Sequence, residues 1–400
     1  MKPASRHGDD TGTTWVLREH GSALSSAVLG VSTVQWRPDV QAQGELMAEL
    51  WALGVRHLLD GEPGRFTVHP YCTPDVVGVR LESPDPQEGA LADTVSRVLH
   101  APLPPVAEGE DGALSLRAAA ARAAQRTASE TAALALVAPP GHRCAMPIAE
   151  RMSVLWTADL AECRQMIERH GKIVAVAGRD LRPPPGTHPL PGHGSAAGAS
   201  PHPGPADSAA VDTAPGEDSV TVVRSATAGL AQIATVTPGV ALGSTAKAAL
   251  HVFWTLLRER EGVFYPLARS RGGLIYEHAA FTREYHEHGV GMSVLSCDPQ
   301  DVEQVIACLR EATARVAAGD VPPALVDEAA AAVGRARAMS LRNPAAVAKV
   351  LLASEVSGVS AEDYPRQLQN VGPAVVSEAA RRTVHRAGWL IRVTLPENPA

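Results

Sequence analysis

The chain has 400 residues, of which 45% are hydrophobic and 20% are charged, and its formal net charge is −7 at pH 7. This length can form two sizeable cores, and the acidic balance provides no basic surface for nucleic acid. No apolar run reaches the ~20 residues of a membrane-spanning helix, and the polar start lacks the hydrophobic region of a signal peptide. Five scattered cysteines argue against a disulfide framework. We expect a cytoplasmic protein with no nucleic-acid or membrane partner.

Strands and helices alternate along the first half of the chain, after a polar segment over residues 1–14 that we expect to be a disordered tail. Leu46, Leu50 and Leu53 recur on one stripe of a helix, which is the spacing of an amphipathic helix. In chain order, the predicted elements are a strand over 27–36, a helix over 40–59, a β-rich stretch over 65–81, helices near 86–99, over 112–135 and over 157–170, and a strand over 172–178. Residues 15–180 form the first predicted lobe.

A stretch rich in Pro, Gly, Ala and Ser, residues 181–218, separates this lobe from the rest of the chain. It contains almost no large apolar residue, so it buries too little surface to offset the entropy lost on ordering. We predict a flexible linker whose His188, His193 and His202 are exposed to solvent rather than bound to a metal.

The second predicted lobe, residues 219–397, repeats the element order of the first. Its predicted elements are strands over 220–224 and 231–236, a helix over 244–258, a strand over 289–297, helices over 301–318, 323–339 and 377–385, and a strand over 389–395. An element order that occurs twice indicates two copies of one unit. The predicted fold class is α+β: two homologous lobes, each a mainly antiparallel sheet with helices packed on one face, joined by the Pro/Gly-rich linker.

One segment of the second lobe carries the clearest motif. Residues 267–276 read LARSRGGLIY, with Arg269 and Tyr276 seven positions apart. This segment resembles the L-R-E-x-x-G-L-x-Y segment of zinc peptidases of the insulysin, pitrilysin and mitochondrial-processing-peptidase family, with Ser270 in place of the glutamate. Two further segments, YCTPDVV over 71–77 and IVAVAG over 173–178, resemble strands of the same family. The resemblance extends over both lobes.

The first lobe departs from the family at the helix that binds zinc. Active members carry H-x-x-E-H, in which two histidines bind zinc and the glutamate activates a water molecule. Aligned through Gly44, the three positions hold Met47, Leu50 and Trp51, none of which has this chemistry. The alternative register, HLLDG over 57–61, keeps one histidine and an acid but ends in glycine. We therefore predict no metal site in this chain.

Other polar residues have simpler interpretations. Glu130, where a third zinc ligand would be sought, is interpreted as a solvated helix residue. The segment YHEH over 285–288 is interpreted as a polar strand edge, because its two histidines are only two residues apart. A self-sufficient hydrolase that binds a metal through His278, His286 and His288 is a third hypothesis.

The resemblance implies the non-zinc-binding subunit of a heterodimeric, two-chain metallopeptidase that is inactive alone. Carried over to this sequence, Arg269 and Tyr276 would bind the substrate carbonyl and stabilise the oxyanion, and Gly273 and His278 would contact the substrate. Zinc would be held by a homologous partner with an intact H-x-x-E-H helix, and a small peptide or precursor would be cleaved. The alternative is a catalytically silent structural or assembly subunit of the same fold, which would not need the Arg/Tyr pair.

Overall fold

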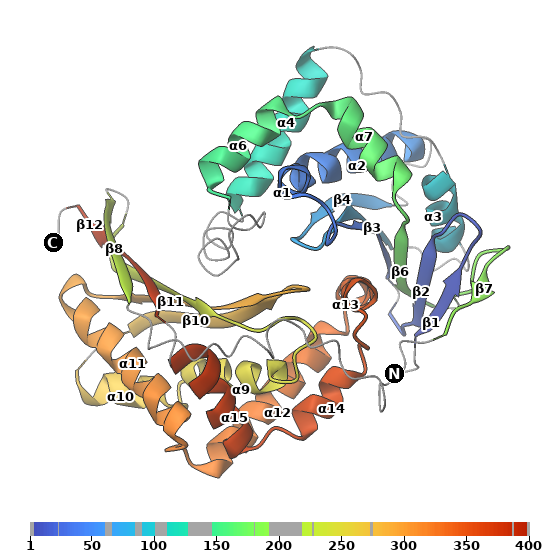
Figure 1. The fold of residues 1–400 in the computed structure, drawn as a ribbon. Coiled ribbons are helices and arrows are strands. Elements are labelled where there is room, and N and C mark those ends of the chain that lie inside the picture. Colours follow the sequence, from blue (N-terminus) through green and yellow to red (C-terminus); the bar gives the residue numbers. More distant parts are fainter. Residues whose placement is uncertain are drawn as a thin grey trace. The chain divides into compact units, whose positions relative to one another are not determined.

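The computed structural model (Figure 1) describes residues 4–22, 24–60, 66–84, 90–100, 110–126, 146–179, 181–191, 218–225, 228–272, 275–385 and 388–397. In these ranges, no helix is long and apolar enough to cross a membrane. The chain divides into two compact units. The first unit comprises residues 1–197 and 338–361, and the second comprises residues 198–337 and 362–400.

The first unit is built on a seven-stranded sheet with the strand order β4-β5-β3-β6-β2-β1-β7. Neighbouring strands are antiparallel except β2 and β6, which are parallel. Its elements are β1 (Ser5–Gly8), β2 (Thr14–Glu19), β3 (Ser25–Ser32), α1 (Pro38–Gln41), α2 (Gly44–Leu59), β4 (Thr67–Cys72), β5 (Val76–Ser83), α3 (Ala90–His100), α4 (Glu110–Arg126), α6 (Ile148–Thr157), α7 (Leu160–Arg169), β6 (Ile173–Gly178), β7 (His188–Pro189) and α13 (Pro344–Ser357).

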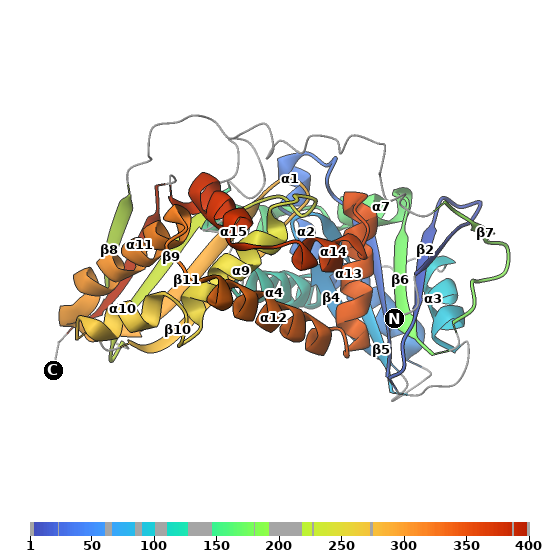
Figure 2. The same cartoon turned by 90° about the horizontal axis from the view of Figure 1, so that it is seen from below.

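Both faces of this sheet are buried, each by its own apolar core. Successive side chains of a strand point to opposite faces. On β3, Leu29 and Val31 belong to the core that includes α2, whereas Val28 belongs to a second core with α13. Helix α13 contributes Leu351 and Leu352 to that second core, and it packs along β3 and β6 (Figure 2). The strands therefore bury apolar residues at consecutive positions rather than at alternate ones.

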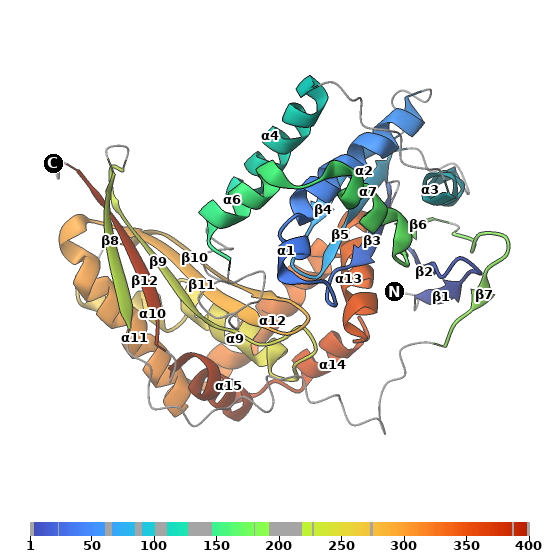
Figure 3. The same ribbon diagram turned by 45° about the horizontal axis from the view of Figure 1, so that its top comes forward.

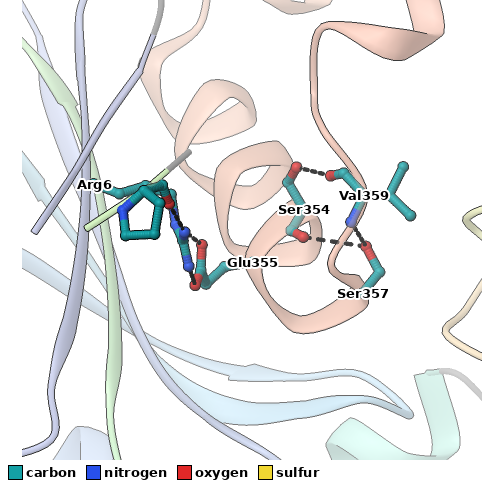
Figure 4. Close-up of polar contacts among 6 residues, drawn as sticks. Arg6, Ser354, Glu355, Ser357 and Val359 are labelled. Carbon is teal, nitrogen blue, oxygen red and sulfur yellow. Dashed lines mark hydrogen bonds and ion pairs between the residues drawn. The ribbon is translucent and has the colours of Figure 1, made fainter. Parts of the chain in front are cut away.

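Helix α13 is fixed to the first unit by polar contacts as well as by packing. At its start, the side chain of Asn343 accepts a hydrogen bond from the backbone N–H of Ala345 at 2.9 Å, which caps the helix. Near its end, Glu355 forms a two-pronged ion pair with Arg6 of β1, in which Nε donates to Oε2 at 2.9 Å (Figure 4). Residues 338–361 thus belong to the first unit, although the sequence prediction places them in the second lobe.

The second unit is built on a five-stranded sheet with the order β10-β11-β9-β12-β8 (Figure 3). Its elements are β8 (Ser219–Ser225), β9 (Ala231–Pro238), α9 (Lys247–Arg258), α10 (Phe264–Ser270), β10 (Ile275–Glu284), β11 (Gly289–Cys297), the 3₁₀ turn η2 (Pro299–Asp301), α11 (Val302–Ala318), α12 (Pro323–Ser340), α14 (Asp363–Gln369), α15 (Pro373–Ala380), the π-helical turn η3 (Arg381–His385) and β12 (Leu390–Pro396). One apolar core joins the helices to the sheet.

The two sheets share one topology. The strands β10-β11-β9-β12-β8 follow the order of β4-β5-β3-β6-β2, and in each set only the last pair is parallel. A long helix, α2 or α9, follows the middle strand in both units. The predicted α+β fold with two similar lobes is confirmed.

The ends of the first unit differ from the sequence prediction. Residues 5–8, which we expected in a disordered tail, form β1 against β2, and His188 and Pro189 of the expected linker form β7 against β1. The backbone N–H of Leu190 also donates to the carbonyl of Arg6 at 2.9 Å, so backbone pairing holds this segment despite its composition. The rest of the predicted linker, and Glu130, lie outside the described residues.

Candidate functional site

Helix α2 carries the three positions that align with the zinc ligands of active peptidases. Met47, Leu50 and Trp51 are 0%, 3% and 2% exposed and belong to the core of the first unit. A thioether, an isobutyl group and an indole offer no carboxylate or imidazole to a zinc ion. In the alternative register, His57 and Asp60 are exposed at the end of α2. The residues at this helix do not fit a zinc site.

The LARSRGGLIY motif forms the connection from α10 to β10. Arg269 is exposed in the last turn of α10, and the hydroxyl of Ser270 donates to the carbonyl of Leu267 at 2.8 Å. Gly272 follows with a φ of +80°, a backbone conformation that suits glycine and turns the chain towards β10. Gly273, which we predicted to contact substrate, lies outside the described residues.

Tyr276 occupies a bulge at the start of β10. The pairing of β10 with β11 shifts between Ile275 and Glu277, and this shift leaves Tyr276 as an extra residue. Its side chain is 52% exposed, and its hydroxyl donates to the carboxylate of Asp298 at 3.3 Å. The charge of Asp298 raises the pKa of Tyr276, so the hydroxyl remains a donor at neutral pH.

His278 is packed among aromatic rings on the helix-covered side of β10. Its ring centroid lies 5.1 Å from that of Phe264 and 5.6 Å from that of Tyr265, and its Nε2 lies 3.0 Å from the hydroxyl of buried Ser293. Burial, and then the charge of Arg258, lower the pKa of His278 to about 4. The imidazole is therefore neutral at pH 7. Its Nδ1 is buried and has no hydrogen-bond partner among the described residues.

A cavity of about 650 Å³ opens in the second unit beside the start of β10. It is lined by the end of α9, the loop that follows α9, α10, the start of β10, and α12. The lining residues are Thr255, Leu256, Arg258, Glu259, Arg260, Glu261, Gly262, Tyr265, Tyr276, Glu277, His278, Leu325, Glu328, Ala329, Ala332 and Arg335. The structure thus brings Tyr276 and His278 to one cavity, whereas Arg269 is not part of its lining.

Most charged residues of the cavity were not predicted from the sequence. The signal that was available is the alternating run RERE over 258–261, directly after the apolar helix α9. Such a run is ordinarily interpreted as a solvated helix end. The contribution of α12 could not be inferred, because α12 and β10 are distant in sequence and line one cavity only in the folded chain.

The segment YHEH is the turn between β10 and β11 rather than a strand edge. The backbone N–H of Tyr285 donates to the carbonyl of His288 at 2.8 Å and closes the turn. From His278 to Glu284, β10 spans about 20 Å at ~3.3 Å per residue. His278 therefore lies at the opposite end of the strand from His286 and His288, and the three do not form one metal site.

Comparison with known proteins gives a family match in the second unit. Residues 193–333 match the family model described as the peptidase M16 inactive domain. Over these residues the chain is similar to the inactive domain of the M16 peptidases. The matched residues include the LARSRGGLIY motif and most of the cavity. The family resemblance inferred from the sequence is confirmed, and a comparison with curated proteins gives no match.

Solved structures share the fold over nearly the whole chain. A protease from Helicobacter pylori has a TM-score of 0.69 at 12% identity and covers 99% of this chain and 100% of its own. A peptidase M16 inactive domain from Pseudomonas fluorescens has a TM-score of 0.69 at 13% identity and covers 99% of this chain and 98% of its own. A chain of complex III2 from Candida albicans has a TM-score of 0.68 at 14% identity and covers 97% of this chain and 95% of its own. At these identities, the likeness establishes the fold.

Proposed function

We propose that this chain is the non-zinc-binding subunit of a two-chain M16 metallopeptidase in the cytoplasm. A homologous partner with an intact H-x-x-E-H helix would hold the zinc, and this chain would supply Arg269 and Tyr276 to the cleavage of a peptide. The contrast between two sites carries the proposal. Apolar side chains fill the zinc positions of α2, while Tyr276 keeps an exposed, protonated hydroxyl in a bulge.

The chemistry assigned to this chain is stabilisation of the oxyanion that forms when water attacks the scissile carbonyl. A phenolic O–H and a guanidinium are both suitable donors, and one positioned donor is typically worth about 3–4 kcal/mol. The hydroxyl of Tyr276 has one proton and donates it to Asp298 in the free chain. The substrate carbonyl would therefore replace Asp298 as its acceptor. Gly273 and the neutral His278 would contact the peptide beside this point.

A second candidate function is a catalytically silent structural or assembly subunit. Two observations favour it: Ser270 replaces the glutamate of the motif, and Arg269 does not line the cavity that holds Tyr276. The fold also occurs in a chain of the Candida albicans complex III2. The two candidates differ in one measurable respect, because only a catalytic subunit changes the turnover of its partner.

The proposal is tested by reconstitution with a zinc-bearing M16 chain from the same organism. Each chain alone and the equimolar mixture are assayed on a fluorogenic peptide library, with size-exclusion chromatography to report the complex. We expect a 1:1 complex whose activity exceeds that of either chain alone by at least tenfold. A complex that forms without any gain in turnover supports the assembly subunit, and a partner that is fully active alone and does not bind this chain contradicts both candidates.

A further inference from the structure

The cavity beside β10 has charges of both signs on its walls. Arg258 forms an ion pair with Glu259, in which Nη2 lies 2.9 Å from Oε1, so these two charges offset each other. The remaining charged residues are Arg260, Arg335, Glu261, Glu277 and Glu328. His278 is neutral at pH 7 and adds no charge. Within the described residues, none of these five has an ion-pair partner, and a lining with two cations and three anions is unsuited to a simple anion or cation but suits a ligand that carries both charges.

The spacing of charges along α12 indicates the length of such a ligand. Glu328 and Arg335 are seven residues apart on one face of the helix, which is two turns or about 10 Å along the axis. Both side chains are exposed, and neither has an ion-pair partner within the described part of the chain. Ala329 and Ala332 lie between them and leave room for a backbone against the helix. This wall therefore presents a carboxylate and a guanidinium at its two ends with a small apolar surface between them.

Two tyrosines complete the lining of the cavity. Tyr265 and Tyr276 line the cavity together with His278, so rings are available to cover apolar side chains of a ligand. The volume of about 650 Å³ lies in the range of ~300–1,000 Å³ that is typical of small-molecule sites. A free amino acid separates its charged groups by only about 2.5 Å, whereas an extended tripeptide spans roughly 10 Å. Only the longer molecule reaches both ends of the α12 wall.

We infer that this cavity binds a short zwitterionic peptide of about three residues, with its ammonium group at Glu328 and its carboxylate at Arg335. The site requires neither the zinc-bearing partner nor peptide cleavage, so it goes beyond the proposed function. It shares the lining residues Tyr276 and His278 with that function, but its charge recognition rests on α12. Short peptides of this kind are what a peptidase releases, so the site gives the chain a means to retain or sense them.

The experiment is isothermal titration calorimetry on the full-length chain alone with trialanine at low salt. Alanine, N-acetyl-trialanine and trialanine amide are the comparison ligands. We expect measurable binding of trialanine, with each blocked peptide and free alanine at least about tenfold weaker, because each lacks one charge-assisted contact. No binding up to millimolar trialanine, or equal affinity for alanine and trialanine, would overturn the inference.

Substitutions assign the two ends. Glu328→Gln should weaken the binding of trialanine about tenfold but leave the binding of N-acetyl-trialanine unchanged. Arg335→Gln should weaken the binding of trialanine about tenfold but leave the binding of trialanine amide unchanged. Asp327→Asn is the matched control, because this acid is exposed on the same helix but does not line the cavity. If both cavity variants bind trialanine as the control does, the inference is wrong, whatever the activity of a reconstituted complex.

Discussion

Replacing Glu284 with glutamine tests the buried charge at the end of β10. The carboxylate lies 2.9 Å from Nε2 of His251 and 3.6 Å from Nζ of Lys247, and its side chain is 12% exposed. Burial would raise the pKa of Glu284, but the hydrogen bond and charge of His251, followed by the charge of Lys247, lower it from 4.5 to about 2. At about 1.36 kcal/mol for each pKa unit, the ionised carboxylate contributes about 3 kcal/mol to folding at pH 7.

The sign of this shift fixes the pH window. Because the pKa is depressed in the folded chain, the contribution is complete above pH 4.5, falls to about 1.4 kcal/mol at pH 3, and disappears as the pH passes through 2. Glu284→Gln should therefore be destabilised by about 3 kcal/mol at pH 7 and by less than half of that at pH 3.

Urea unfolding followed by hydrogen exchange in the peptide covering α9 measures this difference in the second unit alone. The control is Glu277→Gln on the same strand, an exposed position where the change should stay within about 0.5 kcal/mol. A Glu284→Gln difference that stays constant from pH 7 to pH 3, or that is absent at pH 7, would refute the reasoning.

Two further predictions concern the packing and the connection of the units. Gly262→Ala should destabilise the second unit by at least about 1–3 kcal/mol, because the new Cβ would lie 2.0 Å from the carbonyl oxygen of Leu256. In α12, the new Cβ of Gly334→Ala meets only a side chain, at 3.6 Å. This substitution should stabilise the second unit by about 0.5–1 kcal/mol in the same urea titration. Limited proteolysis should cut first within the Pro/Gly-rich linker predicted from composition over 181–218. The two fragments should co-elute in size-exclusion chromatography, because the C-terminal fragment supplies α13 to the first unit. Fragments that separate under native conditions would contradict that packing.

The sequence predicts the elements whose pattern is local. The helix over 40–59 and the strands over 172–178 and 289–297 follow from apolar periodicity and match α2, β6 and β11. Strand β2 and helices α13 and α14 are missing from the prediction. Helix α13 is apolar on several sides, and nothing in its own residues indicates that it packs on the sheet of the first unit. Its placement is a tertiary property.

The candidate site was predictable only in part. The seven-residue spacing identified Tyr276, but the bulge that presents it depends on the register of β10 against β11, which neither strand specifies alone. The neutral state of His278 depends on burial beneath Phe264 and Tyr265, and the wall that α12 contributes depends on a contact between distant segments. Residue types can be read from the sequence, whereas their exposure and partners require the fold.

The turnover of the reconstituted complex with Tyr276→Phe tests the central claim most directly. Arg271→Ala is the control, because this neighbouring arginine forms an exposed ion pair with Glu311 and has no assigned catalytic role. The account predicts an intact complex in which Tyr276→Phe lowers kcat about 10²–10³-fold with little change in KM, while Arg271→Ala leaves both unchanged. An intact Tyr276→Phe complex with the kcat of the unmodified complex would contradict the account.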